Sequence, residues 1–584
     1  MLLRSSRDVL FYWSATLSRT ILVLISVCLA GRSQAEEQSP QSDQPVSIRG
    51  TVVNSVTHQP IARAQVYSPD NRFAAMTDDQ GHFEVAFPQT ADTGTVSKLR
   101  GSPLMARKPG FLPDRDFPGQ NFRLIANATD HTIPLVPEAI LMGRVGLDSS
   151  DTPDGIQVQL FQREIHDGFA HWIPTQIATT NSKGEFRFAE LYAGDYRVGT
   201  HEVGDRDGAD LIPGGKIYAY PPVYFPASSD FSSASTIHLS PGKVFEADVS
   251  LARRQYYPIK ISVRNGPAAG MQINVTVSVR GDGAPGYALG YNAFDGTIRG
   301  ALPNGTYVVE ASTFTQQGAT GMMTLRVANA PAESGQLTLL PDGAIPVHVT
   351  EEFNSPEVLP QNDRVISGNR AGRMYMRKRH QYLNVMLQPV SDFGRGRGAS
   401  LRPPKGPDDE SLAIENVQQG RYWVQVSSSK GYAASVTSGG SDLRRQPLIV
   451  GPGGSSPPIE ITMRDDTASF DGNVEGANSA IDGPGQSASS SSAPFAYVYC
   501  IPLAGGPGQF TKVWVSPDGK FQSPQIPPGE YRILAFSHQR NDLEFRDAEA
   551  MRPYESKGVQ VSLAAGQKEH LQLQLISTAD DSAD

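Results

Sequence analysis

Apolar and polar residues alternate in short runs along most of the chain. In Phe245–Leu251 and Leu571–Leu575 every second residue is apolar, which places these side chains on one face of a β-strand. Turn residues such as Asp78–Gly81 and Asp518–Gly519 precede other alternating segments, as in β-hairpins. Helical periodicity is rare, and only Asp542–Met551 could form a short helix. The pattern predicts an all-β protein built from many short strands.

A small motif recurs at domain-sized intervals. Each copy has a glycine, one further residue, a tyrosine and then an alternating apolar run. The glycines are Gly194, Gly305, Gly420 and Gly529, about 110 residues apart, which is the size of one small domain. A chain of 584 residues is also too long for a single core. We therefore expect a tandem array of about five immunoglobulin- or transthyretin-like β-sandwich modules.

Strand runs and turn signals divide the chain into consecutive segments. The predicted segments are a signal peptide (1–35), a linker (36–45), β-sandwich modules at 46–137, 138–254, 255–343, 344–465 and 466–576, and an acidic tail (577–584). A Gly/Ser-rich stretch, 472–492, interrupts the fifth module and predicts a flexible surface loop.

The N-terminal segment indicates export. Arg4 and Arg7 precede the apolar run Ile21–Ala30, and Ser33 and Ala35 supply small residues for cleavage. The run has only about twelve residues, fewer than the roughly twenty that span a bilayer. We expect cleavage before residue 36, no transmembrane span afterwards, and a periplasmic, outer-surface or secreted protein.

Several of these elements together resemble the carboxypeptidase regulatory-like domain. The resemblance rests on Gly50–Val53, Gln59–Val66, Asp79–Phe83 and the turn Pro528–Tyr531. It implies transthyretin-like β-sandwiches grouped with starch-binding-like, carbohydrate-binding folds. These are scaffold motifs, so the resemblance implies a fold and no activity. The layout is also similar to exported multi-module proteins common in soil bacteria of the acidobacterial kind.

Charge and motif content argue against several functional classes. The formal net charge is −9, which gives no general affinity for nucleic acid. A zinc carboxypeptidase would need a His-x-x-Glu pair and a third histidine. The one His-x-x-Glu in the sequence, His348–Glu351, lies in an alternating strand run that opens the fourth module, where side chains three residues apart face opposite sides of a strand. His166 and His171 are only a weak indication of a metal site, and we expect them to be two solvated histidines in a loop. We predict no catalytic residue, no metal and no cofactor.

Two groups of aromatic residues have separate expected roles. Tyr218, Tyr220, Tyr224 and Phe225 lie in a proline-rich segment and could display ring faces to a sugar, or else cover an open end of the second module. The motif tyrosines follow turns at regular places, which predicts a structural role like that of a tyrosine corner. These tyrosines are Tyr196, Tyr307, Tyr422 and Tyr531.

The sequence predicts a non-catalytic, exported binding or surface-scaffold protein, with a glycan or an envelope protein as its partner. A basic run at 370–380, with Arg395 and Arg397, could dock an acidic partner or form a solvated strand face. One alternative is an envelope accessory protein that docks a transporter. Another is a hydrolase whose active site carries no recognisable motif. The oligomeric state is left open.

Overall fold

Strands form where the alternating runs predict them, and the prediction of an all-β fold is confirmed in a computed structural model. The structure describes the following residues: 46–68, 74–87, 104–115, 131–204, 216–268, 270–279, 284, 286–313, 318–354, 382–393, 397–406, 409–476, 496–503, 508–516 and 518–576. The predicted signal peptide, linker, acidic tail, basic run at 370–380, Arg395 and most of the Gly/Ser-rich stretch lie outside these residues.

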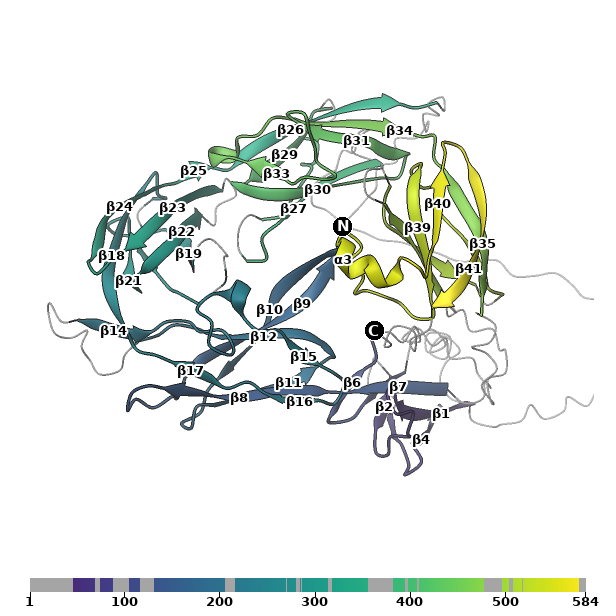
Figure 1. Cartoon of the computed structure of the whole chain (residues 1–584), viewed down its shortest axis with the longest axis horizontal. Helices are drawn as coiled ribbons and strands as arrows, with labels where there is room; N and C mark the ends of the chain where they lie inside the picture. Colours follow the sequence, from purple (N-terminus) through teal and green to yellow (C-terminus); the bar gives the residue numbers. More distant parts are fainter. Residues whose placement is uncertain are drawn as a thin grey trace, which may run out of the picture.

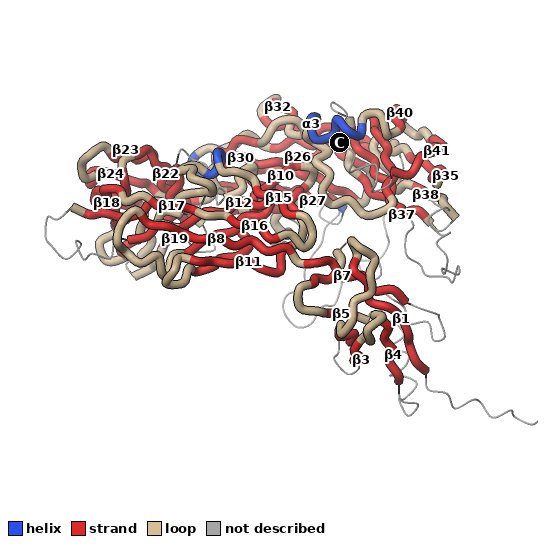
Figure 2. Tube along the Cα trace, turned by 60° about the horizontal axis from the view of Figure 1, so that its bottom comes forward, coloured by secondary structure: helices blue, strands red, loops and turns tan. Residues whose placement is uncertain are grey.

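Buried apolar residues gather into one main cluster for each of five successive stretches of chain. The clusters span residues 48–135, 139–251, 259–339, 345–463 and 468–573. Each cluster lies between β-sheets, as in a β-sandwich. We call these stretches the first to fifth modules. Figure 2 shows that strands dominate every module and that the first module stands apart from the other four.

The first two modules each contain two separate sheets. In the first module the strand orders are β4 (His82–Phe87), β1 (Val46–Asn54), β7 (His131–Pro137), β6 (Phe111–Pro113); and β3 (Ala74–Met76), β2 (Gln65–Tyr67), β5 (Met105–Arg107). In the second they are β10 (Phe169–Thr179), β9 (Gln157–His166), β12 (Gly194–Thr200), β15 (Ile237–Leu239); and β11 (Glu185–Leu191), β8 (Ala139–Leu147), β16 (Val244–Glu246), with β17 (Val249–Leu251) also on β8 and the short helix η3 (Phe231–Ser233) nearby.

The third module borrows two strands from the preceding chain. Its larger sheet has the order β13 (Val203–Gly204), β14 (Ile217–Tyr220), β18 (Arg254–Arg264), β21 (Thr297–Pro303), β20 (Gly290–Asn292), with β24 (Ala332–Thr338) on β18. Its second sheet is β19 (Ile273–Val279), β22 (Gly305–Thr313), β23 (Ala319–Val327), β25 (Leu340–Pro341). Because β14 pairs with β18, the second and third modules share hydrogen bonds across their expected boundary.

The fourth module again has two sheets, whereas the strands of the fifth are connected into one seven-stranded sheet. The fourth has β29 (Leu412–Val417), β26 (Gly343–Glu352), β34 (Ile459–Arg464), β31 (Tyr432–Ser438), β32 (Ser441–Asp442); and β28 (Ala399–Ser400), β27 (Leu383–Pro389), β30 (Gly420–Ser428), β33 (Leu448–Val450), with η4 (Pro452–Gly454). The fifth joins its strands as β37 (Thr511–Val515), β36 (Ala496–Pro502), β39 (Gly529–Phe536), β41 (Lys568–Ile576), β35 (Ser469–Glu475), β38 (Lys520–Gln522), with β40 (Val559–Leu563) on β39, then α3 (Ala548–Met551) and η6 (Arg552–Tyr554).

One pairing recurs in all five modules. The first strand of each module pairs in parallel with a strand from the end of that module, as in β1 with β7, β8 with β17, β18 with β24, β26 with β34, and β35 with β41. The chain therefore enters and leaves each sandwich on neighbouring strands. Successive modules can then turn relative to one another through short connections.

The second to fifth modules follow a closed path, so the fifth module returns to the second (Figure 1). The antiparallel pair β9–β10, which we call the central hairpin, points from the second module toward α3 and the fourth module (Figure 1). The array is therefore folded back on itself, and its modules meet around one hairpin.

Candidate functional site

The central hairpin owes its shape to the dipeptide Asp167-Gly168. Both residues have positive φ, 50° and 77°, and they connect His166 to its cross-strand partner Phe169. Two positive φ values define the two-residue turn that matches the twist of paired strands, and Asp-Gly favours it. The expectation of a loop around His166 and His171 is therefore wrong, because these histidines lie on β9 and β10.

The tip of the central hairpin is bound by the segment that precedes α3 in the fifth module. The guanidinium of Arg546 lies 2.8 Å from the Asp167 carboxylate, and its Nε donates to the Asp167 carbonyl at 2.9 Å. The Arg546 amide donates to the Gly168 carbonyl at 3.3 Å. A Cβ at Gly168 would lie 2.8 Å from ring atoms of Phe545, so only glycine permits this approach.

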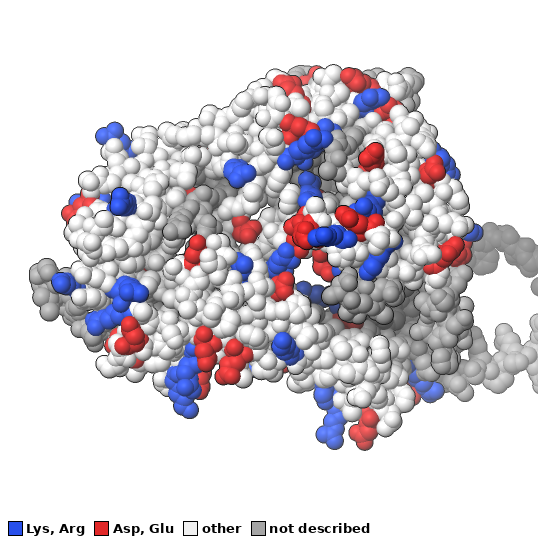
Figure 3. All heavy atoms as spheres, viewed as in Figure 1, with Lys and Arg blue, Asp and Glu red and all other residues white. Residues whose placement is uncertain are grey.

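A second ion pair lies further along the same strand. Arg163 on β9 contacts Glu544 at 2.6 Å, and only 12% of the Glu544 side chain is exposed. This ion pair is partly buried, so removal of one partner would leave the other charge poorly solvated. In the view of Figure 3, acidic and basic side chains gather where Figure 1 shows the hairpin tip meeting α3.

The fourth module contacts the central hairpin from another side. The rings of Phe169 and Trp423 stack with centroids 4.6 Å apart and an interplanar angle of 16°. His171 Nδ1 lies 2.8 Å from an Asp392 oxygen, and Gln425 donates to the Asp167 carboxylate at 3.2 Å. The carboxylate of Asp167 thus contacts both the fourth and the fifth modules.

Beneath the hairpin, rings from two modules form a buried cluster that we call the aromatic hub. Phe393 of the fourth module lies 4.8 Å from Phe231 and 5.5 Å from Phe161, both in edge-to-face geometry. Such pairs stabilise beyond their buried area. The other aromatic members are Trp172 and Tyr224. The guanidinium of Arg197 lies 4.4 Å from the Trp172 ring centroid, and burial lowers its pKa.

His166 and His171 come together, with ring centroids 6.0 Å apart. His166 pairs with Glu164 at 3.3 Å, whereas His171 pairs with Asp392 across the module boundary. Within the described part of the chain, no three histidine, cysteine, aspartate or glutamate side chains are grouped to hold a metal ion. These histidines contribute contacts between strands and between modules.

The aromatic residues proposed for sugar binding are mostly turned inward. Tyr220 and Tyr224 are 1% and 5% exposed, so the expectation that they display ring faces is wrong. The Tyr220 hydroxyl donates to Asp151 at 2.8 Å, and Tyr224 belongs to the aromatic hub. Phe225 packs against the second-module core and Phe245. Tyr218 lies under the guanidinium of Arg253, 4.8 Å from it.

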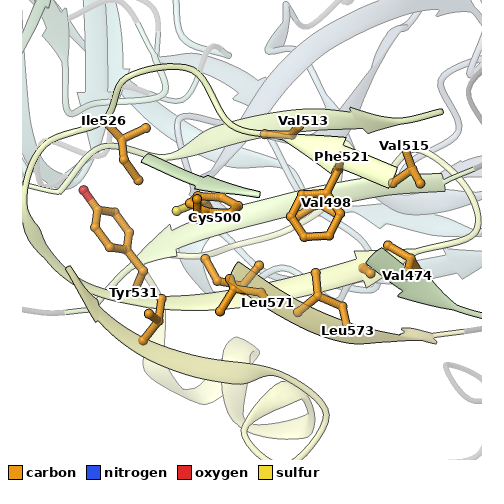
Figure 4. Packing of buried hydrophobic residues seen from close by; sticks show 14 of the residues in the cluster. Val474, Val498, Cys500, Val513, Val515, Phe521, Ile526, Tyr531, Leu571 and Leu573 are labelled. Carbon is orange, nitrogen blue, oxygen red and sulfur yellow. The ribbon is translucent and has the colours of Figure 1, made fainter. Parts of the chain in front are cut away.

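The four motif tyrosines share one geometry. Each hydroxyl donates to the backbone carbonyl four residues earlier: Tyr196 to Tyr192 (2.9 Å), Tyr307 to Pro303 (2.9 Å), Tyr422 to Gln418 (2.9 Å) and Tyr531 to Pro527 (2.6 Å). All four are at most 2% exposed, and burial raises the pKa of Tyr196 to about 12. Figure 4 shows the Tyr531 ring beside Ile526 and Cys500 in the fifth-module core. Burial raises the pKa of the Cys500 thiol.

Sequence reasoning missed the residues that join the modules. Phe393, Glu544 and Arg546 belong to no motif, and Trp423 follows a motif tyrosine without any sign of its contact with Phe169. The partners of these residues lie far away in the chain. The one local signal was Asp167-Gly168 between two alternating runs, which could have predicted the hairpin though not its contacts. Arg397, the described member of the basic group, is exposed.

No helix within the described residues is long and apolar enough to cross a membrane. No family model matches the chain, and no curated protein matches it.

The chain has distant likenesses among solved structures. They include the Bacillus anthracis TIE protein (8% identity, 78% of this chain and 76% of that chain, TM-score 0.14). A variant of BcpA, the major pilin subunit of Bacillus cereus, is 10% identical over 74% of this chain and 99% of that chain, with a TM-score of 0.11. The RrgB pilus protein of Streptococcus pneumoniae is 9% identical over 68% of this chain and 90% of that chain, with a TM-score of 0.13. Likeness at this level carries no functional argument.

Proposed function

We propose that this protein is a non-catalytic, exported scaffold in which the second to fifth modules act as one rigid body. The observation that supports this proposal is that the clustered polar and aromatic side chains contact residues of other modules. Asp167 pairs with Arg546 and His171 pairs with Asp392, each across a module boundary, and the aromatic hub joins two modules. Histidine, carboxylate and guanidinium groups, which could take part in catalysis elsewhere, here connect the modules.

Rigidity gives such a scaffold a definite advantage. Modules on flexible linkers lose conformational freedom when they bind a partner together, and this loss weakens binding. Modules already fixed by the central hairpin avoid that loss. We therefore propose a surface or envelope protein that presents a fixed arrangement of β-sandwich faces. We also propose that the modules are related to carboxypeptidase regulatory-like domains. Such a relation would agree with a scaffold, because the shared motifs imply a fold and no activity.

Export and partner binding can be tested in the same cells. We expect the protein in the envelope or extracellular fraction with an N-terminus near Glu36, as the basic and apolar leader indicates. An intact Met1 terminus in the cytosolic fraction would contradict export. Pull-down from envelope extract with the mature chain should recover a surface component. Recovery of a transporter would instead assign the accessory role, and turnover of a substrate by the purified chain would contradict the non-catalytic proposal.

A further inference from the structure

A polar groove lies where the third and fourth modules meet. Its floor is the outer face of β19, β22 and β23, where side chains lie in two cross-strand rows. The rows are Asn274–Ser312–Thr320 and Thr276–Glu310–Met322. The intervening residues Ile273, Val277, Val309 and Ala311 are buried in the third-module core, so strand alternation directs both rows outward.

The fourth module supplies the wall of the groove. Gln418 and Gln419, from the turn before β30, line it together with the two rows. The Tyr422 hydroxyl holds the Gln418 carbonyl at 2.9 Å, which fixes this turn. Thr320 donates to Asp342 at 3.1 Å, and Asp342 also lies 3.5 Å from the Gln418 amide nitrogen. The groove therefore requires both modules in their docked arrangement.

The lining of the groove defines the chemistry that it can recognise. Amide and hydroxyl groups of Asn274, Thr276, Ser312 and Gln419 can both donate and accept hydrogen bonds. Among the described residues, no lysine, arginine or histidine lines the groove, whereas the Glu310 carboxylate does, and its negative charge disfavours an anionic ligand. Met322, 40% exposed, adds an apolar surface beside these groups. A neutral molecule with many hydroxyls and apolar C–H faces fits this combination.

The groove is shallow and lies on the inner side of the array. Its enclosed volume is about 50 Å³ and the rest is open to solvent, so a ligand would lie along the groove with much of its surface exposed. Figure 1 shows β19 and β22 on the side of the third module that faces the other modules, with β18 and β24 on the outer side. A bound chain would thus lie against the concave side of the array.

We propose that this groove binds a short stretch of a neutral saccharide. The proposal rests on the scaffold function and names the ligand class that the rigid array presents. The structure assigns hydrogen bonding to the Asn274 and Thr276 rows and to Gln419. Binding at one such subsite should be weak, with Kd in the micromolar to millimolar range.

The test uses the mature chain and a panel of neutral hexasaccharides of glucose, galactose and mannose, with an acidic hexuronate oligosaccharide as comparison, measured by titration calorimetry. Thr276→Trp fills the groove and should abolish binding. Thr324→Trp is the matched control, because Thr324 is also an exposed threonine of the same sheet but lies outside the groove lining. Asn274→Ala with Gln419→Ala should weaken binding about tenfold or more, corresponding to two lost hydrogen bonds.

Several outcomes would overturn the groove proposal. These are no binding to any neutral saccharide, binding only to the acidic one, or equal binding by wild type and Thr276→Trp. If Thr276→Trp unfolds, as judged by its melting curve against Thr324→Trp, the double alanine variant decides the question. Failure of the groove leaves the scaffold function standing, because export and envelope pull-down test that function without a saccharide.

Discussion

Neutralising Asp167 should loosen the fifth module from the central hairpin. Asp167→Asn is the sharpest change, since asparagine also favours the positive φ of 50° that this turn position requires. The substitution removes the charge that faces Arg546 at 2.8 Å while the hairpin turn is kept. Any effect can then be assigned to the contact between modules.

The expected magnitude follows from the contact itself. A hydrogen bond to a charged group contributes about 1.5–3 kcal/mol. The two side chains are 33% and 31% exposed, so solvent screening reduces this value. We expect a loss of about 1–2 kcal/mol, which corresponds to roughly a fivefold to thirtyfold larger population of undocked molecules.

Hydrogen exchange measures this population directly. The Arg546 amide donates to the Gly168 carbonyl, so it exchanges only when the contact opens. Peptides covering residues 543–547 should exchange about five to thirty times faster in Asp167→Asn, while peptides from the fifth-module core stay unchanged. Arg49→Ala is the control, because its ion pair with Glu84 is exposed and lies in the first module. If both variants exchange at the wild-type rate, the fifth module does not depend on this contact and the reasoning is refuted.

Three further predictions concern single side chains. Tyr531→Ala should destabilise the fifth module by about 3–5 kcal/mol and Tyr531→Phe by about 0.5–1.5 kcal/mol in denaturant unfolding; equal stability of all three proteins would remove its corner role. Phe393→Ala should weaken the aromatic hub by about 3–5 kcal/mol, whereas Phe294→Ala, at a residue 93% exposed, should change stability by less than about 0.5 kcal/mol; similar melting shifts in both would contradict the hub. Burial raises the pKa of Glu202 from 4.5 to about 7, so the folded state keeps a proton that the unfolded chain releases, and stability should fall as pH rises from about 4.5 to about 7. Glu202→Gln should remove that part of the pH dependence, and an identical melting profile in the variant would contradict it.

The individual sandwiches could be predicted because their signals are local. Alternation over a few residues sets which side chains face a core, and a glycine followed by a tyrosine marks the same corner in four modules. Tyr531 and Pro527 are four residues apart, so the acceptor of the hydrogen bond lies in the turn just before the motif glycine. The even spacing of the copies then indicated the array.

The contacts between modules could not be predicted because they join residues remote in the chain. Arg546 and Asp167 are 379 positions apart, and His171 and Asp392 are 221 apart. No periodicity or short motif links such pairs. The same cause explains the misplaced expectation for Tyr224, whose ring is covered by Phe231 and the neighbouring hub residues. An aromatic and proline-rich segment has the same composition whether its rings meet a ligand or another module.

Small-angle X-ray scattering of the mature chain tests the central claim most directly, namely that the second to fifth modules close around the central hairpin. A closed array predicts a radius of gyration of roughly 25–35 Å, close to that of a compact chain of this length. It also predicts measurable expansion in Asp167→Asn combined with Phe393→Ala. Five modules in an extended row would give roughly 50 Å, from about 35 Å per module. That larger value for the wild-type chain, unchanged in the double variant, would contradict the closed arrangement.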